Sequence, residues 1–195
     1  MNRIPQLDPA TATGKTRQLL DTVQQKLGVV PNLMKVLSNA PAALEGYLQF
    51  SGALAGGVLP ARLREQIAIA VAQANGCDYC LSAHTFIGGK LGLASVDLDR
   101  ARRAEGITSR ESAVLELAVA IVEARGQIGD DSLAAARSAG LTDAEIVEIT
   151  AQVGLNLLTN YVNHVANTIV DFPEVRSAAE HPARTECATA CACNS

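Results

Sequence analysis

The stretch from Glu65 to His84 constrains this chain more than any other. It reads EQIAIAVAQANGCDYCLSAH, an apolar helical segment that breaks at an Asn-Gly pair and continues into a second helix beginning near Cys77. Residues three and four apart share one face of a helix, so Cys77, Cys80 and His84 project the same way. Glu65 lies on the first helix, which must fold back against the second. We therefore expect a dithiol, a base and a carboxylate to lie close together.

Helical signals also cover most of the remaining chain. Apolar residues recur with the period of a helix, and two capping boxes, Thr108 with Glu111 and Thr142 with Glu145, mark helix starts. No run alternates apolar and polar residues with enrichment in β-branched types, so we expect no strands. The sequence predicts an all-α bundle of about eight helices, with the Cys-x-x-Cys motif at the N-terminus of a central helix.

The chain of 195 residues fits one domain followed by a tail. We expect a helical domain over residues 1–176 and a flexible tail over 177–195, because the last segment is small and polar. The tail contains Cys187, Cys191 and Cys193. These cysteines could bind a soft metal or metalloid, could relay electrons to the helix dithiol, or could have no function.

Composition limits the partners. The net charge is −4 and no basic stripe is present, which argues against nucleic acid. No uninterrupted apolar run reaches about 18 residues, so we expect no membrane span, and no apolar leader follows Met1, so we expect a cytoplasmic protein. In a reducing cytoplasm a close cysteine pair is more often catalytic or metal-binding than structural. Only 18% of the residues are charged, which suits buried contacts between subunits of a homo-oligomer.

The two cysteines differ in what favours their thiolates. The thiolate is the nucleophile of cysteine chemistry, and a helix N-terminus or a basic neighbour lowers its pKa. Cys77 lies at the helix start, where the dipole favours negative charge, whereas Cys80 lies one turn before His84, which can take its proton. Glu65 can orient or charge His84. Oxidation of one thiol to a sulfenic acid lets the other close a disulfide.

The pattern of Glu65, Cys77, Cys80 and His84 resembles the AhpD-like alkylhydroperoxidases of the carboxymuconolactone decarboxylase family, over about residues 30–166. The resemblance implies an all-helical protein that forms trimers or hexamers and reduces organic hydroperoxides without a cofactor. It also implies that Cys80 is the peroxidatic cysteine and Cys77 the resolving one. Glu65 and His84 would form a proton relay, and an external dithiol or protein would restore the thiols.

One departure from the family pattern concerns Tyr79, which stands where the best-known peroxidase members carry a second histidine. A tyrosine shuttles protons poorly near neutral pH, so the departure bears on peroxidase efficiency. Tyr161, Asn163 and His164 could line the same pocket, or could be satisfied within the core or at a subunit contact.

The same residues allow two alternative functions. A metal or metalloid could bind Cys77, Cys80 and His84, with Glu65 as a fourth ligand. Decarboxylation of a small lactone is the other alternative, although the decarboxylase branch of the family lacks the dithiol.

Overall fold

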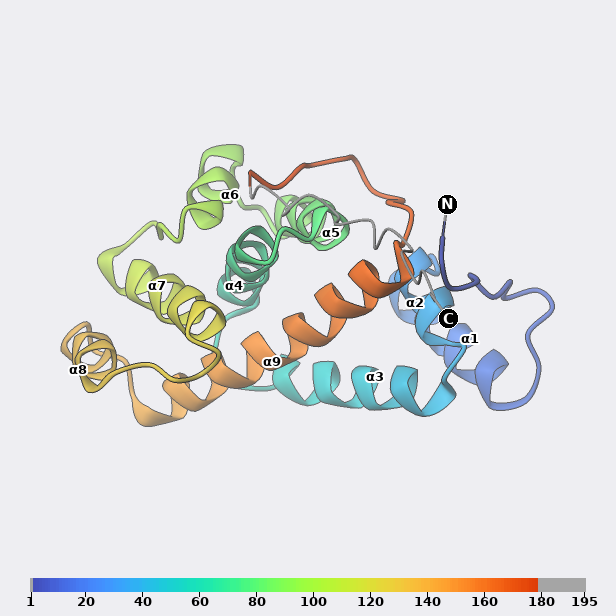
Figure 1. Ribbon diagram of the computed structural model, residues 1–195, viewed down its shortest axis with the longest axis horizontal. Helices are drawn as coiled ribbons and strands as arrows, with labels where there is room; N and C mark the ends of the chain where they lie inside the picture. The colour runs from blue at the N-terminus through green and yellow to red at the C-terminus, as the bar shows by residue number, and fades with distance from the viewer. Residues whose placement is uncertain (1, 179–195) are drawn as a thin grey trace, which may run out of the picture.

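The computed structural model describes residues 2–178, and these residues form nine helices and no strand (Figure 1). The expected all-α fold is confirmed, with nine helices where about eight were expected. The helices are α1 (Gly14–Leu27), α2 (Asn32–Leu37), α3 (Pro41–Ala55), α4 (Ala61–Ala74), α5 (Asp78–Lys90), α6 (Ser95–Arg102), α7 (Ser109–Glu123), α8 (Asp130–Ser138) and α9 (Asp143–Ala166). Within the described range, no helix is both long and apolar enough to cross a membrane.

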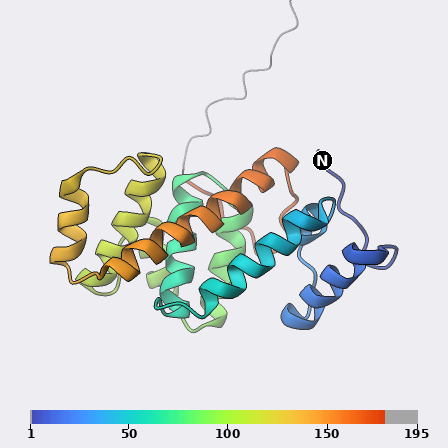
Figure 2. The same ribbon diagram turned by 90° about the horizontal axis from the view of Figure 1, so that it is seen from below.

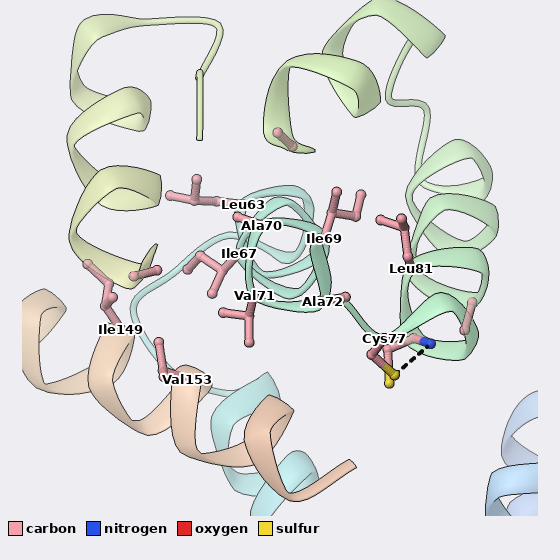
Figure 3. Packing of buried hydrophobic residues seen from close by; sticks show 14 of the residues in the cluster. Leu63, Ile67, Ile69, Ala70, Val71, Ala72, Cys77, Leu81, Ile149 and Val153 are labelled. Atoms are coloured by element: carbon pink, nitrogen blue, oxygen red, sulfur yellow. Dashed lines mark hydrogen bonds between the residues drawn. The ribbon is translucent and has the colours of Figure 1, made fainter. Parts of the chain in front are cut away.

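Helix α4 is the centre of the bundle and packs against α5, α6, α7 and α9. Ile67, Ile69 and Val71 are fully buried on different sides of this helix (Figure 3). A helix that is apolar on all sides must be surrounded by other elements, and the apolar run before the Cys-x-x-Cys motif meets this condition. Because α4 carries Glu65 and leads directly into the motif, the core itself holds the carboxylate beside the second helix.

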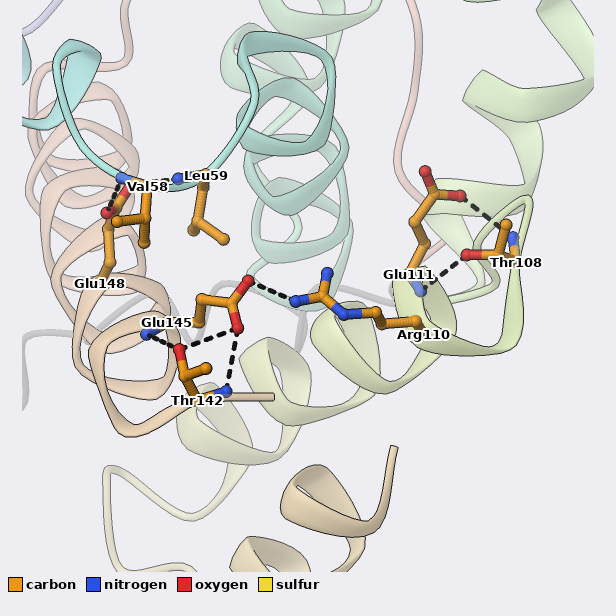
Figure 4. Close-up of polar contacts among 8 residues, drawn as sticks. All are labelled: Val58, Leu59, Thr108, Arg110, Glu111, Thr142, Glu145 and Glu148. Atoms are coloured by element: carbon orange, nitrogen blue, oxygen red, sulfur yellow. Dashed lines mark hydrogen bonds and ion pairs between the residues drawn. The ribbon is translucent and has the colours of Figure 1, made fainter. Parts of the chain in front are cut away.

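Both capping boxes predicted from the sequence are present. The hydroxyl of Thr108 accepts from the backbone N–H of Glu111 at 3.2 Å, and that of Thr142 accepts from Glu145 at 3.3 Å (Figure 4). In each box the glutamate carboxylate accepts from the backbone N–H of the threonine. Arg110 also pairs with Glu145, so the starts of α7 and α9 are joined by a side-chain ion pair.

A buried carboxylate fixes the segment that enters α4. Glu148 of α9 accepts from the backbone N–H groups of Val58 at 2.6 Å and Leu59 at 3.1 Å (Figure 4). A side chain at Gly57 would collide with the same carboxylate, so the close approach requires glycine there. This contact sets the start of α4 relative to α9, the two helices that carry Glu65 and Asn163.

Candidate active site

A tight reversal between α4 and α5 positions the two cysteines. Gly76 has a positive φ of 66°, a conformation that glycine adopts without strain, and it turns the chain from one helix into the next. Cys77 is the N-cap of α5, and its Sγ accepts from the backbone N–H of Cys80 at 3.4 Å (Figure 3). Both residues are free thiols in the structure and are only 1% and 2% exposed. The motif therefore lies at the N-terminus of a central helix, with both sulfur atoms covered.

Glu65 and His84 form a close pair across α4 and α5. His84 Nδ1 lies 2.7 Å from Glu65 Oε2, and both side chains are half-buried. Burial alone lowers the pKa of His84, but the charge and hydrogen bond of Glu65, together with the Cys80 thiolate, raise it above its ordinary value. The imidazolium form of His84 is thus favoured, and its charge acts on the Cys80 thiol.

Two asparagines of α9 complete the surroundings of Cys80. Asn163 donates from Nδ2 to the Sγ of Cys80 at 3.2 Å, and both residues are buried. The amide of Asn160 also helps to stabilise the thiolate, although its Nδ2 makes no hydrogen bond of normal geometry among the described residues. Asn160 is held from its other end, because its Oδ1 accepts from Asn75 at 3.0 Å.

These contacts shift the pKa values of the two thiols in opposite directions. Burial raises the pKa of Cys80, but a hydrogen bond from Cys77, the charge of His84 and the two asparagines outweigh it and lower the pKa to about 7. Cys77 shifts the other way: its hydrogen bond to Cys80, and then its burial, raise its pKa well above the ordinary value. Cys80 therefore holds the negative charge of the pair, and Cys77 keeps its proton and uses it in a hydrogen bond to the sulfur of Cys80.

Tyr47 of α3 belongs to the same surroundings. Burial, and then the negative charges of Cys80 and Glu65, raise the pKa of its hydroxyl to about 12, so the hydroxyl keeps its proton at neutral pH. No motif in the sequence marks Tyr47 or Asn160 as a site residue. The available signal was the pair of amides three residues apart on α9, Asn160 and Asn163, which lie on one face of the helix.

Tyr79 has a structural environment of its own. Its hydroxyl accepts from the backbone N–H of Leu33 at 3.0 Å, in the first turn of α2. Its ring meets that of Phe172 edge to face, with centroids 5.8 Å apart. Burial, and to a smaller extent the nearby carboxylate of Asp171, raise the pKa of the Tyr79 hydroxyl well above its ordinary value. Tyr79 thus holds α2 and the segment after α9 against α5.

The other candidates are placed differently. Tyr161 is exposed on α9, and the half-buried His164 lies with Nε2 3.4 Å from the carbonyl oxygen of Gly76, at the turn before Cys77. The tail cysteines lie outside the described residues. Among residues 2–178, no group of three or more histidine, cysteine and acidic side chains is arranged to hold a metal ion.

Comparisons with known proteins agree with the fold. Residues 41–109, which include the four predicted site residues, match the model of the carboxymuconolactone decarboxylase family. The structure of an uncharacterized peroxidase-related protein from Ralstonia eutropha JMP134, described as an alkylhydroperoxidase AhpD core, superposes with a TM-score of 0.78 at 26% identity, covering 87% of this chain and 92% of that chain. A peroxidase-related protein from Silicibacter sp. TM1040 gives 0.75 at 25% identity, covering 86% and 89%.

A third structure shares the fold at lower identity. A variant of the debrominase Bmp8, in complex with 2,3,4-tribromopyrrole, has a TM-score of 0.74 at 17% identity, covering 87% of this chain and 91% of that chain. The comparison with curated proteins found no match.

The fold and the buried Cys-x-x-Cys pair define an AhpD-like all-helical protein. The resemblance drawn from the sequence is confirmed, because residues 41–109 match the model of the carboxymuconolactone decarboxylase family and the fold is similar to that of AhpD-like peroxidase-related proteins.

Proposed function

We propose that this protein is a thiol peroxidase that reduces organic hydroperoxides through Cys80 and Cys77. The observation that carries the proposal is the different surroundings of the two thiols: Asn163 donates to the sulfur of Cys80 at 3.2 Å, and the charge of His84, which Glu65 holds at 2.7 Å, acts on the same sulfur. These contacts lower the pKa of Cys80 to about 7, whereas that of Cys77 is raised. A peroxidatic cysteine must be a thiolate near neutral pH, whereas a resolving cysteine can stay protonated until the sulfenic acid has formed. Family and neighbours point to the same class of enzyme.

The first step uses the Cys80 thiolate as the nucleophile. Its sulfur attacks one oxygen of the hydroperoxide, the O–O bond breaks, and the alcohol leaves with a proton. The imidazolium of His84, which Glu65 stabilises at 2.7 Å, is the proton donor we assign to that leaving group. Asn163 holds the thiolate in place before attack. The product on the enzyme is a sulfenic acid at Cys80.

The second step joins the two cysteines. The sulfur of Cys77 attacks the sulfur of the Cys80 sulfenic acid, an S–S bond forms, and water leaves with the proton that Cys77 gives up. Cys77 is three residues before Cys80 and already touches it through the Cys80 N–H, so little movement is required. An external dithiol, small or on a partner protein, then reduces the disulfide to two thiols.

The alternatives receive less support. A metal site needs at least three converging ligands, and none is assembled within residues 2–178. Lactone decarboxylation does not use a dithiol, and it leaves the contrasting surroundings of the two cysteines unexplained. The shared fold does not select the substrate, since it also occurs in a protein named a debrominase.

We also propose that a second copy of this chain covers α3 and the adjacent face of α9. Leu158, Tyr161 and Val165 follow each other at steps of three and four residues and are all exposed. Helix α3 lies beside α9, contains one charged residue and buries only Leu44 (Figure 2). An apolar surface that extends over two neighbouring helices is typical of a subunit interface, and steps of three and four suit helix pairing.

The proposed peroxidase activity is tested by mixing the reduced protein with cumene hydroperoxide in a stopped-flow instrument. Wild-type protein should consume the hydroperoxide much faster than free cysteine does and form a disulfide between Cys77 and Cys80. The Cys80→Ser variant should lose this reaction, and Cys77→Ser should react once but form no intramolecular disulfide. Thiols that react no faster than free cysteine would refute the proposal.

A further inference from the structure

Two buried polar atoms beside Cys80 have no hydrogen-bond partner. Asn160 of α9 is fully buried, and its Nδ2 makes no hydrogen bond among the residues that the structure describes. Asn163 is 4% exposed, and its Oδ1 likewise has no partner within residues 2–178. An unpaired polar atom in a protein interior is unfavourable, so each one calls for an explanation. One donor and one acceptor are thus unused next to the same sulfur.

Both amides are fixed in direction by the bonds at their other ends. The Oδ1 of Asn160 accepts from the Nδ2 of Asn75 at 3.0 Å, so the Nδ2 of Asn160 points away from Asn75. Asn75 is the C-cap of α4 and comes two residues before Cys77. The Nδ2 of Asn163 donates to the Sγ of Cys80 at 3.2 Å, which leaves Oδ1 as the unpaired atom of that amide. The unused donor and acceptor are therefore held in place before any substrate enters.

The two amides also face the same sulfur. Asn160 and Asn163 are three residues apart on α9 and lie on one face of that helix. Asn163 contacts the sulfur directly, and Asn160 contributes to the lowered pKa of Cys80. An amide nitrogen carries two hydrogens, so Asn160 can face the sulfur and still donate to an oxygen beside it. The donor and the acceptor border the space that an oxygen attacked by Cys80 must occupy.

We propose that the Nδ2 of Asn160 and the Oδ1 of Asn163 form a hydroxyl-binding site that holds the terminal O–H group of the hydroperoxide against Cys80. The proposal rests on the proposed peroxidase function and adds a substrate-binding role for two residues. The terminal oxygen accepts from Asn160, and its O–H donates to Asn163. A hydroxyl group is both donor and acceptor, which matches what the two amides leave unused. A carbon–halogen bond or a disulfide offers no O–H group to this site.

The bound orientation defines the first chemical step. The Cys80 thiolate attacks the terminal oxygen, an S–O bond forms, and the O–O bond breaks. The electron pair of that bond leaves with the second oxygen, which takes a proton from the His84 imidazolium and departs as the alcohol. The hydrogen of the attacked hydroxyl group stays in place, so the product is the sulfenic acid of Cys80. Its S–O–H group keeps the donor of Asn160 and the acceptor of Asn163 as partners.

The test compares two electrophiles on the full chain. Cumene hydroperoxide presents a terminal O–H group, whereas iodoacetamide is attacked at carbon and loses iodide. Samples are quenched over time, and mass spectrometry follows the modification of Cys80. Each variant is assayed at a pH where thiolate absorbance shows Cys80 to be ionised, so that a change in its pKa does not enter. For each protein, the hydroperoxide rate is divided by the iodoacetamide rate.

The donor of Asn160 should matter for the hydroperoxide alone. We expect Asn160→Ala to lower the ratio about a hundredfold, as when one positioned donor is removed from an oxygen-binding site of an enzyme. Asn160→Leu keeps the volume of the side chain and should lower the ratio equally, which excludes an effect of a cavity. Asn156→Ala is the matched control, because Asn156 is also buried on α9 but donates to the carbonyl oxygen of Gln152. Unchanged ratios in both Asn160 variants would overturn the proposal.

Asn75 provides a second test, since it is a positioning residue that acts only by fixing Asn160. Asn75→Ala frees the Oδ1 of Asn160 and should lower the same ratio about tenfold, because the donor is no longer held in one direction. In the Asn160→Ala background the same substitution should have no further effect. An equal loss in both backgrounds would show a merely structural role of Asn75 and contradict the proposed geometry.

The outcomes distinguish the hydroxyl-binding site from the peroxidase function on which it rests. A wild-type protein that consumes cumene hydroperoxide no faster than free cysteine would refute both. A fast wild-type protein whose ratio is unchanged in the Asn160 variants would retain the peroxidase function and lose the hydroxyl-binding site. In either case iodoacetamide reports on the Cys80 thiolate alone.

Discussion

Asn163 donates from its side-chain Nδ2 to the sulfur of Cys80 at 3.2 Å, although 83 residues separate them in the chain. The contact joins α9 to α5 across the core and turns an amide towards a sulfur atom that has almost no access to solvent. A hydrogen bond to a buried anion stabilises it more than one in water would. The Asn163–Cys80 contact is therefore one reason why Cys80, and not Cys77, holds the charge.

The pH dependence of the reaction should reflect this charge. Because the pKa of Cys80 is lowered from 9.0 to about 7, the thiolate fraction and the rate of hydroperoxide consumption should rise through pH 7 and level off above pH 8. Between about pH 7 and 9 the Cys80 thiol is protonated in the unfolded state but largely ionised in the folded state. The free energy of unfolding should therefore also rise with pH over that window. Stopped-flow rates across this range provide the check. An inflection near pH 9, as for an ordinary thiol, would contradict the assignment.

Replacing Asn163 should move that inflection. Asn163→Ala removes one hydrogen bond to a charged group, about 1.5 kcal/mol, which corresponds to roughly one pKa unit upward for Cys80. The change is measured by the ultraviolet absorbance of the thiolate during a pH titration. Asn156→Ala is the matched control, because Asn156 is equally buried on α9 but donates to the carbonyl oxygen of Gln152. If both variants shift the titration equally, the effect is not specific to Asn163.

Glu65 should act on Cys80 through His84. Glu65→Gln keeps a hydrogen-bonding side chain but removes the charge that raises the pKa of His84, so that pKa should fall. A smaller imidazolium fraction stabilises the Cys80 thiolate less, and the pKa of Cys80 should rise by several tenths of a unit or more. Nuclear magnetic resonance titration of His84 gives the first value and thiolate absorbance the second. Glu45→Gln, which alters an exposed carboxylate paired with Lys15, should change neither.

The contact of the Glu148 carboxylate with the chain before α4 should make substitutions at Gly57 and Glu148 non-additive in the free energy of unfolding. Gly57→Ala should destabilise the fold by about 2 kcal/mol, because its methyl group would overlap the carboxylate of Glu148. Gly56→Ala is the control, since a methyl group there meets only the carbonyl oxygen of Ala53 at an ordinary 3.6 Å. In a Glu148→Ala background the cost of Gly57→Ala should largely disappear. Additive effects in urea denaturation would show that the overlap is not the cause.

A charged residue introduced into the proposed interface between two copies should disrupt that interface. Leu158→Glu adds a carboxylate to the exposed apolar face of α9 without altering the buried face, so the assembly should dissociate while helicity is retained. Sedimentation velocity gives the mass, and circular dichroism gives the helicity. The control is Glu116→Gln on α7, far from that face in the sequence and on another helix. An unchanged mass for Leu158→Glu would place any interface elsewhere.

The sequence anticipates features that depend on local spacing. The two capping boxes, the all-helical fold and the pairing of Glu65 with His84 each follow from residues within about twenty positions of one another. Contacts that depend on how distant helices pack were not predictable in the same way. The sequence indicated Asn163 only as one of three residues that could line the pocket, because its approach to Cys80 depends on the crossing of α9 over α5, which no local pattern encodes.

Two tyrosines show the same difference between features set by local spacing and features set by the packing of distant helices. Tyr79 was compared with a relay histidine because of its position in the motif, yet its hydroxyl binds the first turn of α2. Tyr47, which no sequence motif marks, lies near the charges of Cys80 and Glu65. In both cases the direction of the side chain is set by neighbours that are distant in the sequence.

The role of Cys80 as the peroxidatic cysteine is tested most directly by trapping the first intermediate. The Cys77→Ser variant is treated with one equivalent of cumene hydroperoxide in the presence of dimedone, and labelled peptides are mapped by mass spectrometry. We predict a dimedone adduct on Cys80, because its thiolate is oxidised to a sulfenic acid and the resolving thiol of Cys77 is absent. Labelling of Cys77 in the reciprocal Cys80→Ser variant, with none on Cys80 in Cys77→Ser, would contradict it.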